Sequence, residues 1–185
     1  MLTRLRQRVA PAVERVASAC GRVMPSPNAW TALGLLLALA AAYSYRAGLA
    51  PQAGALVLAS GFTDLVDGAV ARKLGKATPR GSFLDSNLDR VGESAVYLGL
   101  MTGPWGLQTV AAVAMAASLL VSYSRSRAEA AGLKAEGVGY GERAERLAVL
   151  ALSSLAGYVY YGVVVVAVLA AVTFAQRLYV YGSKL

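Results

Sequence analysis

The chain has 185 residues, of which 57% are hydrophobic, and a formal net charge of +8. Its mean hydropathy of +0.52 and its long apolar runs predict a protein that crosses a membrane several times and argue against a soluble domain, which needs less apolar sequence. Because the basic residues cluster in particular connections, topology and anionic lipid or phosphate ligands explain the charge better than nucleic acid, and we expect no nucleic-acid partner.

Two residue types limit the chemistry further. The chain has no histidine, which excludes a histidine-based metal site or general base. Any bound metal ion must therefore be held by carboxylate, carbonyl or water oxygen, ligands that suit Mg²⁺, Mn²⁺ or Ca²⁺. Cys20 is the single cysteine, so no internal disulfide can form. We interpret it as a small residue that fills space in the packing.

The first segment, residues 1–24, alternates apolar and arginine positions at roughly helical spacing. This pattern predicts an amphipathic helix that lies on an anionic membrane surface. A frayed basic tail is the alternative. We expect residues 25–185 to form one membrane domain.

Six apolar stretches follow, and they predict an all-α integral membrane protein with six transmembrane helices. They cover residues 29–46, 52–73, 82–101, 105–127, 143–157 (extended toward 161) and 162–180. Breaks at Gly103-Pro104 and between Gly157 and Gly162 separate the later stretches.

The distribution of lysine and arginine predicts the orientation of these helices. From the N-terminal segment through the successive connections to the tail, the counts are 5, 1, 5, 0, 5, 0 and 2. This alternation is what the positive-inside rule expects of six spans with both termini in the cytoplasm. We therefore expect a multi-pass protein of the cell (plasma) membrane.

Four aspartates interrupt the apolar sequence near the predicted cytoplasmic ends of the second and third spans. They are Asp64, Asp67, Asp85 and Asp89. The i, i+3 and i, i+4 spacings place each pair on one helix face, and Gly75 and Pro79 break the chain between the pairs, which predicts a helical hairpin. Carboxylates inside a membrane are costly and mark a functional site.

Four carboxylates that converge cannot all stay ionised without cations. One or two Mg²⁺ or Mn²⁺ ions are the simplest solution, and two such ions are a recurring device in phosphoryl and pyrophosphate chemistry. The alternative is that Arg72, Arg80 and Arg90 neutralise the aspartates in structural salt bridges.

The residues around the aspartates suit a nucleotide. Gly68 would let a ligand approach the backbone beside Asp67, and Arg72 can bind phosphate oxygens. Asn28 and Thr31 at the start of the first span could add polar contacts, or they could simply cap the helix.

The stretch Asp64-x-x-Asp67-Gly68-x-x-Ala71-Arg72-x8-Gly81-x3-Asp85-x3-Asp89 resembles the signature of the CDP-alcohol phosphotransferase family, with every fixed position present. The resemblance implies a six-span membrane enzyme, usually a dimer. Such enzymes move a phosphatidyl-type group from a CDP-linked lipid to an alcohol and release CMP.

The resemblance also implies roles for individual residues. The four aspartates would hold two metal ions, and Asp89 would also be the general base that deprotonates the acceptor hydroxyl. The CDP-lipid site would be lined by Asn28, Thr31, Asp64, Gly68, Ala71, Arg72, Thr78 and Gly81.

A second basic cluster bears on the acceptor. Several arginines at the cytoplasmic side favour an acceptor that already carries a phosphate, although positive-inside topology alone explains part of the cluster. Its sequence resembles the branch of phosphatidylinositol-phosphate and archaetidylinositol-phosphate synthases, which implies inositol 1-phosphate as acceptor. The matching phosphate-binding residues are Ser122, Arg125, Arg127, Arg143 and Arg146, and Arg177 is a further candidate.

Three alternatives stay open at this point. Glycerol 3-phosphate is also anionic and would make the chain a phosphatidylglycerophosphate synthase. A cation transporter or channel would spread acidic residues along the membrane depth, whereas these aspartates lie on one side. An inactive membrane scaffold would not need an intact signature.

Overall fold

The computed structural model describes residues 19–22, 24–135 and 137–185. The described residues form long α-helices and no strand. In chain order these are α2 (Pro27–Arg46), α3 (Ala50–Lys73), α4 (Pro79–Thr102), α5 (Gln108–Ala130), α6 (Arg143–Leu155) and α7 (Val159–Gly182). The all-α class is thus confirmed.

Most of the amphipathic helix expected over residues 1–24 lies outside the described residues. The part that is described, residues 19–22, is helical.

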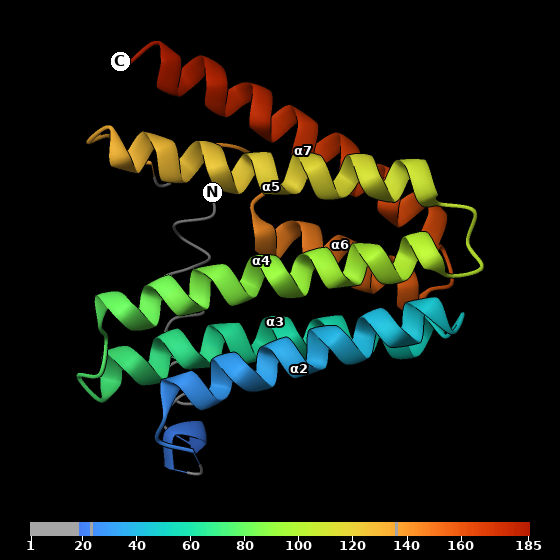
Figure 1. The fold of residues 1–185 in the computed structure, drawn as a ribbon, viewed down its shortest axis with the longest axis horizontal. Helices are drawn as coiled ribbons and strands as arrows, with labels where there is room; N and C mark the ends of the chain where they lie inside the picture. Colours follow the sequence, from blue (N-terminus) through green and yellow to red (C-terminus); the bar gives the residue numbers. More distant parts are fainter. Residues whose placement is uncertain (1–18, 23, 136) are drawn as a thin grey trace.

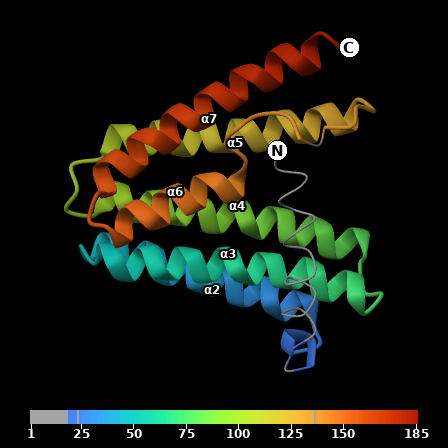
Figure 2. The ribbon, with the colours of Figure 1, turned by 180° about the vertical axis from the view of Figure 1, so that it is seen from behind.

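The helices run alternately up and down in one bundle (Figures 1 and 2). On one side α2 packs against α3 and α4, on the other α5 packs against α7, and α6 lies between α3 and α7. Because successive helices are antiparallel, the connection at residues 74–78, the connection at 131–142 and the C-terminus share one end of the bundle.

Small residues set the distance between α2 and α4. A Cβ atom on Gly92 would lie 3.0 Å from Cβ of Ala38, and one on Gly99 would collide with the backbone carbonyl of Ala42. Membrane helices that approach this closely gain van der Waals contact along their length. This contact fixes how far α4 is shifted along the axis of α2. It thereby also fixes the position of Asp85 and Asp89, which α4 carries near the shared end of the bundle.

Polar groups in the bundle interior pair with one another. Tyr45 Oη and Ser154 Oγ lie 2.7 Å apart, and Tyr97 Oη and Ser118 Oγ lie 3.2 Å apart. Such pairs satisfy groups that would otherwise be costly to bury. They also tie α2 to α6 and α4 to α5.

Two of the described helices, α3 and α7, are long and apolar enough to cross a membrane by composition alone. Helices α2, α4 and α5 have 20, 24 and 23 residues, long enough for a hydrocarbon core of about 30 Å, but their composition does not single them out as membrane spans in the same way. Helix α6 has 13 residues and extends only about 20 Å. The six-span count stays a prediction.

The expected boundary between the last two helices was wrong. We expected a break up to residue 162, whereas α6 ends at Leu155 and α7 begins at Val159. Gly157, with φ of +79°, makes the turn. Gly162 lies inside α7, where a Cβ atom would collide with the Ser153 side chain, so this glycine permits helix packing and does not end a helix.

Candidate active site

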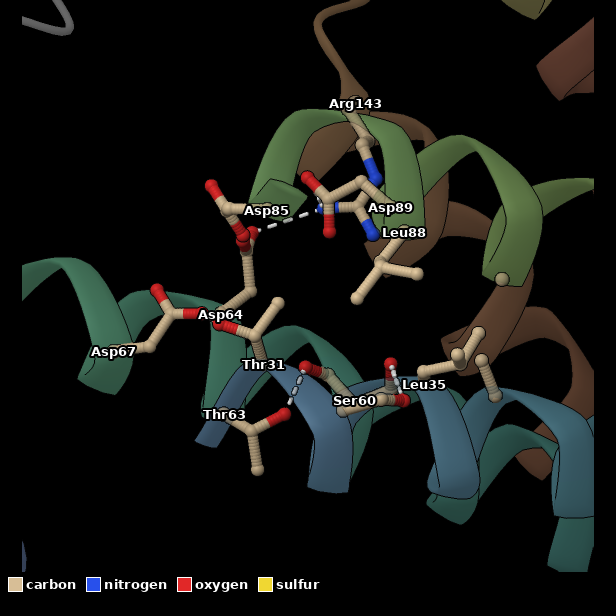
Figure 3. A pocket seen from close by; sticks show the side chains of 13 residues that line it. Thr31, Leu35, Ser60, Thr63, Asp64, Asp67, Asp85, Leu88, Asp89 and Arg143 are labelled. Atoms are coloured by element: carbon tan, nitrogen blue, oxygen red, sulfur yellow. Dashed lines mark hydrogen bonds and ion pairs between the residues drawn. The ribbon is translucent and has the colours of Figure 1, made fainter. Parts of the chain in front are cut away.

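The four aspartates converge at the end of the bundle where α3 finishes and α4 begins. Figure 3 shows Asp64 and Asp67 from α3 and Asp85 and Asp89 from α4 around one space, with Thr31 of α2 beside them. One carboxylate oxygen from each of Asp64, Asp67 and Asp85 lies within 4.8 Å of the other two. Asp89 lines the same cavity without belonging to that close group.

These residues fit a divalent cation. Every donor is a carboxylate oxygen, the ligand type that hard cations prefer. Asp85 Oδ1 is buried and has no hydrogen-bond partner, which leaves it available as a ligand. Thr31 Oγ1 donates a 2.9 Å hydrogen bond to Asp67 Oδ2 and so fixes the orientation of the most buried of the four carboxylates. Thr31 therefore supports the site, while Ser26 occupies the N-cap position of α2.

An arginine from α6 joins the cluster. Arg143 Nη1 lies 2.9 Å from Asp64 Oδ2 and 2.9 Å from Asp89 Oδ2. The sequence pattern placed Arg143 in the acceptor site and did not predict these contacts. Of the arginines considered as structural partners, Arg90 lies 3.7 Å from Asp89. Salt bridges with arginine are thus part of the cluster, but those observed involve Asp64 and Asp89 and leave the carboxylates of Asp67 and Asp85 available to bind a cation.

A pocket of about 260 Å³ opens on one side of the aspartates. Its lining includes every residue expected to contact the CDP group except Asp64, namely Asn28, Thr31, Gly68, Ala71, Arg72, Thr78 and Gly81. Thr78 caps α4, and its Oγ1 accepts a 3.1 Å hydrogen bond from the Gly81 backbone N–H. Lys76 also lines the pocket and donates a hydrogen bond to the Pro25 carbonyl. We call this space the first pocket.

A second pocket of about 250 Å³ opens on the other side of the aspartates. Five of the six residues expected to bind the acceptor phosphate line it: Ser122, Arg125, Arg143, Arg146 and Arg177. The sixth, Arg127, is exposed on α5 and is not among the lining residues. Arg177 is 2% exposed, and its Nη1 donates a 2.7 Å hydrogen bond to the Val121 carbonyl. Through Arg177, helix α7 also contributes to the lining of the second pocket.

The aspartates divide between the two pockets. Asp67 and Asp85 line the first pocket, whereas Asp64 and Asp89 line the second. A cation site at the junction of two pockets that each carry basic side chains can bring two phosphate-bearing molecules into contact, because it neutralises both where they meet.

The structure adds two acidic residues that sequence reasoning missed. Glu93 is 3% exposed and accepts a 3.0 Å hydrogen bond from Arg146 Nη2, while Arg146 Nη1 donates to the Gly141 carbonyl. Glu142 lines the second pocket and lies 3.7 Å from Arg177. For Glu93 a signal was available, since it follows Asp85 and Asp89 at the same four-residue spacing.

A family model described as CDP-alcohol phosphatidyltransferase matches residues 24–176. The chain belongs to this family. The chain is therefore a membrane transferase of phospholipid biosynthesis.

Curated relatives of the chain include archaetidylinositol phosphate and phosphatidylinositol phosphate synthases. The archaetidylinositol phosphate synthase of Pyrococcus horikoshii is 36% identical over 179 residues, covering 97% of this chain and 95% of its own length. The phosphatidylinositol phosphate synthase of Cutibacterium acnes is 37% identical over 156 residues, covering 80% of this chain and 75% of its own length.

Solved structures agree with these relatives. The phosphatidylinositol phosphate synthase of Mycobacterium tuberculosis with CDP-DAG bound matches with a TM-score of 0.79 and 28% identity, covering 91% of this chain and 92% of that chain. The same enzyme in complex with manganese and citrate matches with a TM-score of 0.79 and 27% identity, covering 92% and 89%.

Proposed function

We propose that this transferase moves the phosphatidyl-type group of a CDP-linked lipid to inositol 1-phosphate and releases CMP. The lipid backbone is diacylglycerol or archaeol. The observation that carries the proposal is the acidic cluster with a basic pocket on either side, one for each substrate. The names of the relatives support inositol phosphate as the acceptor, and the CDP-DAG and manganese of the M. tuberculosis structures support the donor and the metal.

The first pocket is the proposed site of the CDP group. Arg72 would bind its phosphate oxygens, and the bare backbone at Gly68 would let the nucleotide lie close to α3. Asp64, Asp67, Asp85 and Asp89 would hold Mg²⁺ or Mn²⁺, with two ions expected. When bound, the ions would neutralise the diphosphate and make CMP a better leaving group.

The second pocket is the proposed site of the acceptor. Arg125, Arg143 and Arg177 would hold its phosphate, which directs a free hydroxyl toward Asp89. Asp89 would take the hydroxyl proton. The acceptor oxygen would then form a bond to the lipid-side phosphorus as the bond from that phosphorus to the CMP oxygen breaks.

The proposal includes an assembly and an orientation. We expect a homodimer in the plasma membrane, with both termini and the active site on the cytoplasmic side. The basic residues at the end of the bundle that holds the aspartates support this orientation. Membership of a transferase family argues against the transporter or channel considered from the sequence.

An acceptor panel tests the proposal. Purified protein with Mn²⁺ and CDP-diacylglycerol or CDP-archaeol is given inositol 1-phosphate, glycerol 3-phosphate, serine or free inositol, and CMP release is measured. We expect release with inositol 1-phosphate alone. Release with glycerol 3-phosphate instead would make the chain a phosphatidylglycerophosphate synthase, and release with free inositol would contradict the role of the basic pocket.

A further inference from the structure

Helix α4 carries a third carboxylate in line with Asp85 and Asp89. Glu93 follows Asp89 by four residues, so the three side chains lie on one face of the helix. Glu93 lies one turn deeper in the bundle, where its side chain is 1% exposed. It lines neither of the two large pockets.

Two arginines from the first turn of α6 approach this buried carboxylate. Arg146 Nη2 lies 3.0 Å from Glu93 Oε1, with both side chains 1% exposed. Arg143 Nε lies 3.9 Å from Glu93 Oε2. Glu93 Oε2 and Arg143 Nε are both buried without a hydrogen-bond partner, so this second contact can tighten without displacing another group.

Arg143 is therefore shared between two sets of carboxylates. Its Nη1 contacts Asp64 and Asp89, which are proposed metal ligands, while its Nε faces Glu93. A cation held by Asp64 and Asp89 would repel the guanidinium and compete for the carboxylate oxygens that Nη1 contacts. Glu93 is the carboxylate that then remains to hold Arg143 at the wall of the second pocket.

We propose that Glu93 is a positioning residue for the acceptor. It holds Arg143 and Arg146 so that their guanidinium groups face the second pocket while cations occupy the aspartates. It touches neither substrate and acts through the arginines. This inference rests on the proposed function, since it assumes that the second pocket binds a phosphate-bearing acceptor.

The role differs from that of a purely structural ion pair. If Glu93 only neutralised Arg146, replacing Glu93 in a variant that already lacks Arg146 would not weaken acceptor binding further, because the damage from breaking a buried pair comes from the charge left unpaired. If Glu93 also positions Arg143, the double variant binds the acceptor more weakly than Arg146→Gln alone does.

The experiment compares Glu93→Gln, Arg146→Gln, the double variant Glu93→Gln/Arg146→Gln and the control Glu145→Gln with the wild type. Glu145 is a carboxylate of the same α6 turn with one buried oxygen that lacks a hydrogen-bond partner, and it lines neither large pocket. For each Mn²⁺-loaded protein we measure the melting temperature, the KM of each substrate, and the Kd of inositol 1-phosphate by calorimetry without CDP-lipid.

In Glu93→Gln we expect the KM and Kd of inositol 1-phosphate to rise about 10-fold or more, by analogy with the losses that follow when the hydrogen-bond partner of a metal ligand is removed. The KM of the CDP-lipid should stay within about 2-fold. The double variant should regain the wild-type melting temperature but bind inositol 1-phosphate more weakly than Arg146→Gln, and Glu145→Gln should match the wild type. A double variant with the same Kd as Arg146→Gln overturns the proposal, and so does an equal rise in both KM values.

The assay separates this inference from the proposed function. If the wild type binds glycerol 3-phosphate and not inositol 1-phosphate, the acceptor assignment fails, and Glu93 is judged on the Kd of glycerol 3-phosphate. If neither binds, inorganic phosphate serves as the probe. Equal phosphate affinity in the wild type and Glu93→Gln then overturns the role of Glu93.

Discussion

Asp89 lines both the space between the aspartates and the second pocket, and unlike Asp64 it lies outside the close group of carboxylate oxygens. Replacing it by asparagine keeps the side chain's size and removes its ability to take a proton. We expect kcat of Asp89→Asn to fall by about 10²–10⁴-fold, the usual contribution of a general base. The measurement is CMP release at saturating Mn²⁺ and substrates.

Asn87→Ala is the matched control for Asp89→Asn. Asn87 lies on the exposed side of the same helix and donates to the Phe83 carbonyl, so its loss should leave kcat unchanged. A wild-type rate in Asp89→Asn would remove Asp89 from the role of base.

Gly68 and Arg72 lie next to each other in the lining of the first pocket. A Cβ atom on Gly68 would lie 3.3 Å from Arg72 Nη1, so Gly68→Ala should push the guanidinium away and narrow the room for a phosphate. We expect the KM of the CDP-lipid to rise about 10-fold, the effect of losing about 1.4 kcal/mol of binding, with the acceptor KM unchanged.

Gly61→Ala is the control for Gly68→Ala. Gly61 lies on the same helix, and a Cβ atom there would have no atom within 4 Å. Since alanine favours a helix over glycine, this variant should be as stable as the wild type or more so. An unchanged CDP-lipid KM in Gly68→Ala would show that the nucleotide does not approach α3 at this point.

At the scale of helices, the sequence predicted those parts of the site that follow from local spacing. The i, i+3 and i, i+4 pairs of aspartates, with Gly75 and Pro79 between them, were sufficient to expect converging carboxylates on a helical hairpin. The contacts of Arg143 with Asp64 and Asp89 were not predictable in this way, because they depend on how deep α6 begins within the bundle. The expectation that Gly162 ends a helix was wrong for a similar reason. The presence of glycine at this position is explained by the close packing of α7 against Ser153, which depends on tertiary structure.

The hairpin of α3 and α4 should be stabilised by the cation that it binds. Removal of divalent ions leaves converging carboxylates without a counter-charge, so EDTA should abolish activity and lower the melting temperature. At a Mn²⁺ concentration of about 100 Kd, mass action gives about 2.7 kcal/mol of stabilisation. The check is a melting curve with EDTA and with added Mn²⁺. Asp85→Asn should show no Mn²⁺-dependent shift, and a full shift in that variant would place the cation elsewhere.

The contact between α2 and α4 should be sensitive to a single methyl group. A Cβ atom on Gly99 would collide with the backbone of Ala42, and the backbone can yield only if the helices separate. We expect Gly99→Ala to lose about 1–3 kcal/mol of stability, as overpacked sites do. Because Thr31 on α2 supports Asp67 on α3, activity should fall as well. The measurement is the melting temperature of Gly99→Ala compared with that of Gly61→Ala. Equal melting temperatures in the two variants would mean that α2 and α4 pack less tightly at Gly99 than the structure shows.

At the scale of the whole molecule, the proposed reaction needs the aspartates and both pockets to open on the side of the membrane that supplies the CDP-lipid and the acceptor. The basic residues gather at this end, which the positive-inside rule assigns to the cytoplasm. Two engineered cysteines can test the orientation in a Cys20→Ser background. Lys134→Cys marks the connection beside the second pocket, and Tyr158→Cys marks the turn between α6 and α7. Both positions are exposed.

A membrane-impermeant maleimide should label Tyr158→Cys in intact cells and leave Lys134→Cys unlabelled. Inverted membrane vesicles should give the opposite result, and detergent should expose both cysteines equally. The physical reason is that moving the arginines and lysines of residues 72–90 and 125–146 across the bilayer is costly, so the chain inserts with these segments inside. Labelling of Lys134→Cys in intact cells would place the aspartates on the outer face, away from any cytoplasmic supply of CDP-lipid, and the proposed reaction could not proceed there.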